Sequence, residues 1–188
     1  MTGQQTDPLL TGAVRPAKAL LVDDRRDNLI ALEAMLQGLP LQAVPVDSGE
    51  AALKQLLVDD FALILLDAQM PEMDGFETAS HIKRRERTRH IPIIFLTAAD
   101  RDARLALRGY AAGGVDYLTK PFDPWVLRAK VSVFVDLWIK GQQLKRQAEQ
   151  WALLSGAVDA AINLLSGEDL PEAARRARTK LEAAREGY

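Results

Sequence analysis

The chain has 188 residues, and 48% of them are hydrophobic, which is enough for one domain of roughly 120 residues with an appendage. The net charge of −2 argues against a chain-wide surface for nucleic acid. The sequence has no cysteine and no apolar run approaching ~20 residues, so we expect a cytoplasmic protein without disulfides, Cys-based zinc sites or membrane spans.

Short apolar runs alternate with helical patterns along residues 17–137, after an N-terminal arm (1–16) that lacks the layout of a signal peptide. The most apolar run, FALILLD, favours a strand at the centre of a sheet. Pro45 favours a position near the sheet edge for the second run. The predicted strands are 18–23, 41–47, 61–67, 91–97 and 115–119.

A helical pattern follows each predicted strand. Asp27 and Ser48 are candidate N-terminal caps of the first two helices, and Gly38 is a candidate stop. Pro124 suits the first turn of the last helix. The predicted helices cover 27–39, 48–60, 75–87, 100–113 and a segment that starts at 123. These repeats predict an α/β fold, with a five-stranded parallel sheet doubly wound by helices on both faces.

Polar residues stand at the carboxyl ends of the predicted strands, which meet at one edge of a parallel sheet. The first strand ends in Asp23 and Asp24, and the third ends in Asp67. The fourth ends in Thr97, and Lys120 follows the fifth. Adjacent carboxylates repel one another unless a divalent cation joins them, and ligation by oxygen alone suits Mg²⁺ or Mn²⁺.

Asp67 is the candidate nucleophile of this edge. A carboxylate beside a divalent metal, an ammonium and a hydroxyl is equipped to carry a phosphoryl group as an acyl phosphate. The metal and Lys120 would neutralise charge on the transferring oxygens. The alternative interpretation makes these acids ordinary strand-end residues in solvent, and it leaves their convergence with Lys120 unexplained.

Four segments resemble the receiver domain of bacterial two-component response regulators, in order and at strand ends. They are LLVDD, LLDAQMPEMDG, FLTA and DYLTKPF, and the resemblance covers residues 17–137. It implies the flavodoxin-like or CheY-like fold and a sensor histidine kinase as phosphoryl donor. It also implies a phosphoacceptor rather than an enzyme, with at most self-phosphorylation and autodephosphorylation.

The resemblance further implies roles for individual residues. Asp67 resembles the phosphorylated aspartate, and Lys120 resembles the partner of its phosphoryl group. Asp24 resembles the direct Mg²⁺ ligand, with Asp23 acting mostly through water. The backbone carbonyl of Gln69 resembles the third protein ligand of the ion.

The resemblance implies roles for further positions in the same way. Thr97 and Tyr117 resemble the pair that changes rotamer on phosphorylation. Pro121 resembles a proline that follows a cis peptide. Gln69 and Ala99 stand where the family tunes phosphate loss, and neither is an acid, so no rate is predicted.

A phosphatase of the haloacid dehalogenase type, which also uses an aspartyl phosphate, is the competing interpretation. It needs a general acid two residues after the nucleophile, where this chain has Gln69. A phosphodonor role for His81 is less favoured, because SHIKRRERTRH is typical of a solvated helix face. The chain also lacks an ATP-binding Gly-rich loop, which argues against a kinase.

Residues 138–188 form an extension of near-neutral charge, a poor match for a nucleic-acid backbone. Apolar residues recur every seven positions, which predicts that the last receiver helix continues, coiled-coil-like, to about residue 165. The large positions of this heptad seam are Leu137, Leu144, Trp151, Val158 and Leu165. The other positions are Phe134, Gly141, Ala148, Ser155 and Ile162. A break at 166–171 and a short helix at 172–186 are predicted next.

The sequence leaves the output of the chain open. In one hypothesis the heptad seam forms a homodimer or binds a helical partner protein. In another the chain is the input module of a larger phosphatase-type or cyclase-type effector that is absent from this sequence. The extension folding back on its own receiver is a further arrangement of the same helices.

Overall fold

The structure is a computed structural model, and it describes residues 16–98, 113–164, 175–177 and 179. Most of the predicted arm, nearly all of the predicted helix at 100–113, Leu165 and the predicted break lie outside the described residues. Of the predicted final helix, residues 175–177 and 179 are described, and they are helical.

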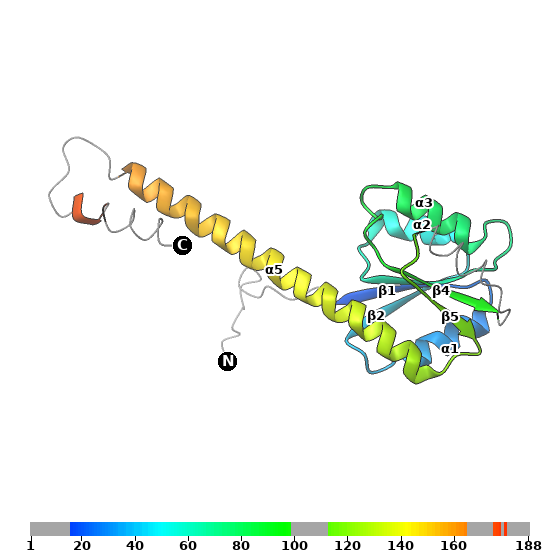
Figure 1. Ribbon diagram of the computed structural model, residues 1–188. Helices are drawn as coiled ribbons and strands as arrows, with labels where there is room; N and C mark the ends of the chain where they lie inside the picture. Colours follow the sequence, from blue (N-terminus) through cyan, green and yellow to red (C-terminus); the bar gives the residue numbers. More distant parts are fainter. Residues whose placement is uncertain (1–15, 99–112, 165–174, 178, 180–188) are drawn as a thin grey trace, which may run out of the picture. The chain divides into compact units, whose positions relative to one another are not determined.

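The described strands form one sheet in which every neighbouring pair is parallel. The strands are β1 (Ala17–Val22), β2 (Leu41–Val46), β3 (Leu63–Asp67), β4 (Ile93–Ala98) and β5 (Asp116–Lys120). Their order is β2-β1-β3-β4-β5, so β3 is central and β2 lies at an edge. Figure 1 shows the sheet, with β1, β2, β4 and β5 labelled. The predicted central strand and the edge position of Pro45 are therefore confirmed.

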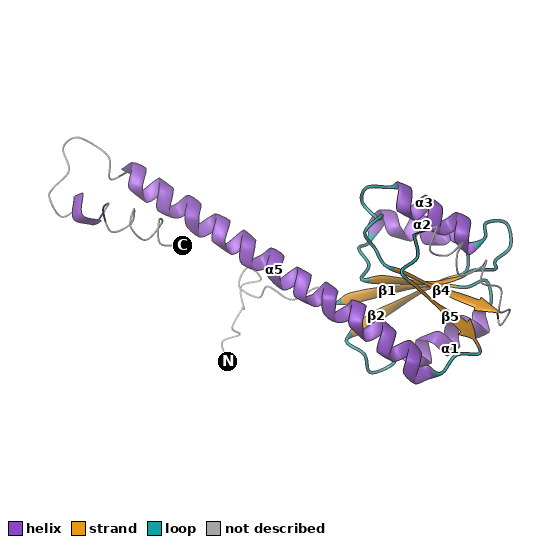
Figure 2. Cartoon of the chain, in the orientation of Figure 1, coloured by secondary structure: helices purple, strands orange, loops and turns teal. Residues whose placement is uncertain are grey.

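Helices cover both faces of the sheet, with α1 and α5 on one face and α2 and α3 on the other (Figure 2). The described helices are α1 (Arg26–Leu36), α2 (Gly49–Val58), α3 (Gly75–Arg84) and α5 (Pro124–Leu164). Strand residues alternate between the two cores: Leu63 and Leu65 of β3 pack with α1 and α5. Ile64 and Leu66 pack with α2 and α3. The predicted doubly wound α/β fold is confirmed.

The two predicted helix caps have different outcomes. The Ser48 hydroxyl accepts a hydrogen bond from the backbone N–H of Ala51 at 3.3 Å, as expected of the N-terminal cap of α2. The predicted cap at Asp27 is wrong, because Arg25 is the N-terminal cap of α1. Asp27 lies in the first turn, where its negative charge still suits the helix dipole.

A cation on α5 holds the end of α1. The Arg128 guanidinium donates through Nη1 to the backbone carbonyls of Met35 (2.7 Å) and Gln37 (2.6 Å). These carbonyls belong to the last turn of α1 and its cap, where intrahelical partners run out. Gly38 follows with φ of 80°, a left-handed conformation that suits glycine and ends the helix as predicted.

The last helix is continuous from Pro124 to Leu164, which confirms the predicted continuation beyond the receiver. The chain divides into two compact units, residues 1–139 and 140–188, and α5 contributes to both. Within the first unit, Leu127, Val131 and Val135 of α5 are buried in the core. Among the helices that the structure describes, none has the length and apolar character needed to cross a bilayer.

The residues of the heptad seam differ in their exposure. Phe134 is half-buried and packs against the core on the α1 side of the sheet, so it belongs to the receiver rather than to an exposed seam. Ile162 is also buried. Leu137, Leu144 and Trp151 expose 60%, 66% and 54% of their surface. Exposure does not separate the large from the small positions, because Val158 is half-buried whereas Ala148 and Ser155 are exposed.

Candidate functional site

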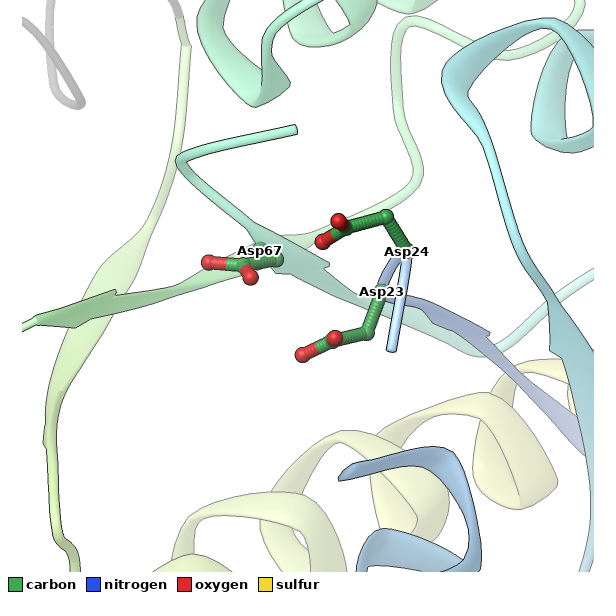
Figure 3. Close-up of side chains that lie close together, drawn as sticks. All are labelled: Asp23, Asp24 and Asp67. Atoms are coloured by element: carbon green, nitrogen blue, oxygen red, sulfur yellow. The ribbon is translucent and has the colours of Figure 1, made fainter. Parts of the chain in front are cut away.

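Three carboxylates gather at the carboxyl ends of β1 and β3 (Figure 3). Asp23 and Asp24 directly follow β1, and Asp67 is the last residue of β3. One oxygen from each acid lies within 4.8 Å of an oxygen from each of the others. They come together because β1 and β3 are parallel neighbours, so the carboxyl ends of both strands lie at the same end of the sheet.

Lys120, the last residue of β5, joins two of these acids. Its Nζ donates to Oδ2 of Asp23 at 2.8 Å and to Oδ2 of Asp67 at 3.0 Å. Burial lowers the pKa of Lys120, but the hydrogen bonds and charges of the two acids outweigh burial and raise the pKa above 10.5. Lys120 is therefore a cation at neutral pH. The Lys120–Pro121 peptide is cis, as the resemblance implies.

Asp67 is nearly buried, with 7% of its surface exposed. Burial raises the pKa of Asp67 above its ordinary value, the Lys120 ammonium lowers it, and the Asp23 charge raises it again. The backbone N–H of Gln69 donates to Oδ1 at 3.3 Å and lowers the pKa of Asp67, yet the net shift of that pKa is upward. The site thus holds an anion whose charge is only partly compensated, and a further cation would stabilise it.

The two acids after β1 have different surroundings. Asp23 is fully buried and accepts hydrogen bonds from the backbone N–H of Arg25 at 3.0 Å and from Lys120. Asp24 is exposed and lines a cavity of about 600 Å³ between α1, the end of β2 and the start of α2. Asp24 therefore presents its carboxylate to solvent, whereas Asp23 is occupied by protein donors.

The donor set of this edge fits a hard divalent cation. Asp24 and Asp67 supply carboxylate oxygens, and the candidate third ligand is the backbone carbonyl of Gln69, two residues after Asp67. Mg²⁺ prefers oxygen ligands and retains several waters, which an exposed Asp24 permits. A cation here would also offset the burial and the Asp23 charge that raise the pKa of Asp67.

The loop after β3 is anchored to that strand. The backbone N–H of Gly75 donates to the carbonyl of Ala68 at 3.1 Å. Asp74 caps α3, since its side chain accepts from the backbone N–H of Glu77 at 2.7 Å. The start of α3 is thus fixed beside the candidate nucleophile.

Thr97 and Tyr117 lie on neighbouring strands beside the acid cluster. Thr97 is in β4, exposes 9% of its surface, and follows Leu96, the register partner of Asp67. Tyr117 is in β5, pairs in register with Phe95, and exposes 43% of its surface. The structure thus places the buried hydroxyl of the predicted switch pair near the site and the ring of Tyr117 at the surface.

Asn28 is the site residue that the sequence reasoning missed. Its side-chain amide nitrogen lies 2.8 Å from Oδ1 and 3.0 Å from Oδ2 of Asp23. The available signal was its position in the first turn of the helix that starts directly after Asp23 and Asp24. A polar side chain there, within reach of a buried acid, is a candidate hydrogen-bond partner.

Comparison with known proteins places the chain in a family. A model of the response regulator receiver domain matches residues 19–132. The chain belongs to the receiver domain family. The match begins within β1 and ends in the first part of α5, so it includes every acid of the cluster and Lys120.

Curated proteins similar to this chain are longer than it. The sensor histidine kinase GacS of Pseudomonas protegens is 33% identical over 150 residues, which are 78% of this chain and 16% of the kinase. The response regulator PleD of Caulobacter vibrioides is 36% identical over 152 residues, 80% of this chain and 33% of PleD. The chain therefore spans a third or less of the length of these two relatives.

Solved receivers have the same fold. The chemotaxis protein CheY4 of Vibrio cholerae matches with a TM-score of 0.60 and 27% identity, over 64% of this chain and 99% of CheY4. The receiver domain of the histidine kinase PA1611 from Pseudomonas aeruginosa matches with a TM-score of 0.56 and 32% identity, over 67% and 99% of the two chains. That structure is described with a magnesium ion coordinated in its active-site cleft.

Proposed function

We propose that this receiver accepts a phosphoryl group on Asp67 from the phosphohistidine of a sensor histidine kinase, in a reaction that requires Mg²⁺. The observation that carries the proposal is the Lys120 ammonium, which lies 2.8 Å from Asp23 and 3.0 Å from Asp67 within a cluster of three acids. A cation that bridges a nearly buried carboxylate is placed to neutralise negative oxygens added to that carboxylate.

The transfer is a displacement at phosphorus. An oxygen of Asp67 forms a bond to phosphorus, the P–N bond of the phosphohistidine breaks, and its electron pair returns to the imidazole. Lys120, held cationic by its two acids, offsets the charge that gathers on the phosphoryl oxygens. Mg²⁺, if bound by the acid cluster, would supply further neutralisation of the negative charge.

The residues that would hold the ion divide by their exposure. Asp24 and Asp67, with the backbone carbonyl of Gln69, would bind Mg²⁺ directly. Asp23 would contribute through water, because its oxygens already accept from Arg25, Asn28 and Lys120. Mn²⁺ suits the same oxygen ligands.

The conformational response would begin at Thr97. On phosphorylation its hydroxyl would donate to the new phosphoryl oxygens, and Tyr117 would move toward the space that it leaves. Tyr117 lies on β5, and α5 starts four residues after that strand ends. A change at the acid cluster would in this way bias the packing of α5.

The output would be homodimerisation or binding of a helical partner through the exposed positions of the heptad seam. Leu137, Leu144 and Trp151 expose more than half of their surface on one long helix. An alternative is that the chain is the input module of a longer effector. The coverage of only 33% of PleD, and of 25% of a probable cyclic di-GMP phosphodiesterase of Vibrio cholerae, favours that alternative.

Phosphorylation by acetyl phosphate tests the central proposal. The wild-type chain should shift on a phosphate-affinity gel only when Mg²⁺ is present, and Asp67→Asn should abolish the shift. Asp27→Asn is the matched control, since Asp27 is an exposed acid in the first turn of α1 and should label normally. Undiminished labelling of Asp67→Asn would refute the assignment.

A further inference from the structure

The side-chain amide of Asn28 contacts the acid cluster, and the proposed transfer of the phosphoryl group does not use it. Asn28 lies in the first turn of α1 and is half-buried. Its Nδ2 donates to both oxygens of Asp23, at 2.8 Å and 3.0 Å. An amide that faces both oxygens of one carboxylate fixes the rotation of that carboxylate about its last bond.

Each oxygen of the Asp23 carboxylate already accepts two hydrogen bonds from protein donors, which opposes direct ligation of a metal ion. A carboxylate offers about four lone-pair positions. Oδ1 accepts from the Arg25 backbone at 3.0 Å and from Asn28, and Oδ2 accepts from Asn28 and from Lys120 at 2.8 Å.

We propose that Asn28 is a positioning residue that holds the Asp23 carboxylate against Lys120 and keeps it from ligating the metal ion directly. The proposal rests on the proposed phosphoacceptor role of Asp67. Asn28 acts on the reaction through two other side chains: it orients Asp23, and Asp23 in turn holds the Lys120 ammonium beside Asp67. This role of Asn28 would also explain why Asp24 is free to bind the metal ion directly whereas Asp23 holds Lys120.

Removing the amide would free half of the acceptor positions of Asp23. The carboxylate would then rotate more freely. Its oxygens would become available as direct ligands of a cation. Lys120 would lose its fixed partner and would spend less time beside Asp67. Phosphorylation should therefore slow, while the affinity for Mg²⁺ should hold or increase. A purely structural role for Asn28 would lower both together.

The first test compares rates with metal affinity in the full chain. Asn28→Leu keeps a branched side chain of similar size without a donor. Its phosphorylation by acetyl phosphate at saturating Mg²⁺ should be at least about tenfold slower than that of the wild type. Its Kd for Mg²⁺, from an NMR titration without acetyl phosphate, should lie within about threefold of the wild-type value or be tighter. Asp27→Leu, one position away on the exposed side, should change neither.

Two outcomes of this comparison would overturn the proposal. One is an unchanged rate for Asn28→Leu. The other is a loss of Mg²⁺ affinity by the same factor as the rate, which would indicate general damage to the site. If Asn28→Leu does not fold, Asn28→Ser serves for the same comparison.

The second test needs neither metal nor phosphate. In ¹H–¹⁵N spectra of the metal-free wild type, the Asn28 side-chain amide should be shifted from the exposed Asn and Gln amides and should exchange slowly with solvent. It is assigned by its absence in Asn28→Leu, and Asp23→Ala should return it to the exposed position. An Asn28 amide that already resembles exposed amides in the wild type would overturn the proposal. A wild type that shows the shifted amide but takes up no phosphate would instead refute the proposed function alone.

Discussion

Gly75 lies so close to Asp67 that a Cβ atom on Gly75 would stand 2.1 Å from the backbone carbonyl oxygen of Asp67. No side chain fits at this distance, so the start of α3 and the end of β3 must separate if Gly75 is replaced. Gly75→Ala should lower the free energy of unfolding by about 1–3 kcal/mol. Urea denaturation measures the loss.

The matched control for this substitution is Gly141→Ala. Gly141 lies in α5, and nothing lies within 4 Å of the Cβ position that it lacks. The alanine should favour the helix by about 1 kcal/mol, because glycine is the poorer helix former. A loss of stability in Gly141→Ala as large as that in Gly75→Ala would contradict the explanation by close approach.

Replacement of Lys120 should destabilise the fold, because Asp23 and Asp67 would remain nearly buried without their shared cation. Lys120→Met should lower the free energy of unfolding at pH 7 by about 2 kcal/mol in metal-free buffer. Added Mg²⁺ should recover part of the loss by taking the place of the ammonium charge. Equal stability of wild type and variant in urea titrations with EDTA would show that the ion pairs of Lys120 with Asp23 and Asp67 make no net contribution to the free energy of unfolding.

The raised pKa of Asp67 predicts a pH dependence of stability. A carboxyl whose folded-state pKa lies above 3.8 binds its proton more tightly in the folded state, so its contribution to stability falls as the pH rises from 3.8 through the raised value. Asp67→Asn removes this cost. The variant should therefore gain stability over the wild type as the pH rises to 7, in metal-free urea titrations. A gain that is the same at every pH would show that Asp67 does not titrate with a raised pKa.

Arg128 should contribute to stability through the end of α1. Arg128→Ala leaves the carbonyls of Met35 and Gln37 without the cation, and should lower the free energy of unfolding by about 1–3 kcal/mol. Arg84→Ala, at an exposed position of α3, should change it by less than about 0.5 kcal/mol. Thermal and urea unfolding of both variants measure these changes. Equal losses of stability in Arg128→Ala and Arg84→Ala would contradict the prediction.

The heptad seam should matter for association and not for phosphorylation. Leu144→Ala with Trp151→Ala should weaken self-association at least about tenfold in sedimentation equilibrium. Gln143→Ala with Gln150→Ala, at the adjacent exposed positions, is the control. Asp67 should be phosphorylated normally in both. A wild type that stays monomeric at tens of micromolar, with and without beryllofluoride, would exclude homodimerisation through the seam.

The sequence predicted the sheet and the acid cluster because both follow from strand ends. The apolar run that stops at Asp67 identifies a buried strand, and parallel neighbours must bring their carboxyl ends to the same edge. Asp23, Asp24 and Lys120 then fall into place without knowledge of any side-chain geometry. The edge strand was predictable as well, because Pro45 has no backbone N–H to donate, and in an edge strand that position can face solvent instead of a neighbouring strand.

Contacts that depend on the rotation of a helix were not predictable in this way. Asn28 lies in the first turn of α1, within reach of Asp23, because the helix is capped by Arg25, whereas the sequence pattern placed the cap two residues later, at Asp27. Phe134 fits the seven-residue repeat equally well whether it faces the receiver or a partner. In the structure, α5 packs on the sheet so that Phe134 contacts the core of the receiver.

The alternation of β3 between two cores also limits how this chain can change its length in evolution or design. Leu63 and Leu65 face one core, Ile64 and Leu66 face the other, and Asp67 follows in the same strand. One inserted residue would exchange the two faces and displace the acid from Lys120, so both the fold and the chemistry would fail together. Insertions and deletions are tolerable mainly in the loops at the amino-terminal ends of the strands. Fused tags, sensors or further domains can be accommodated there without disturbing the acids.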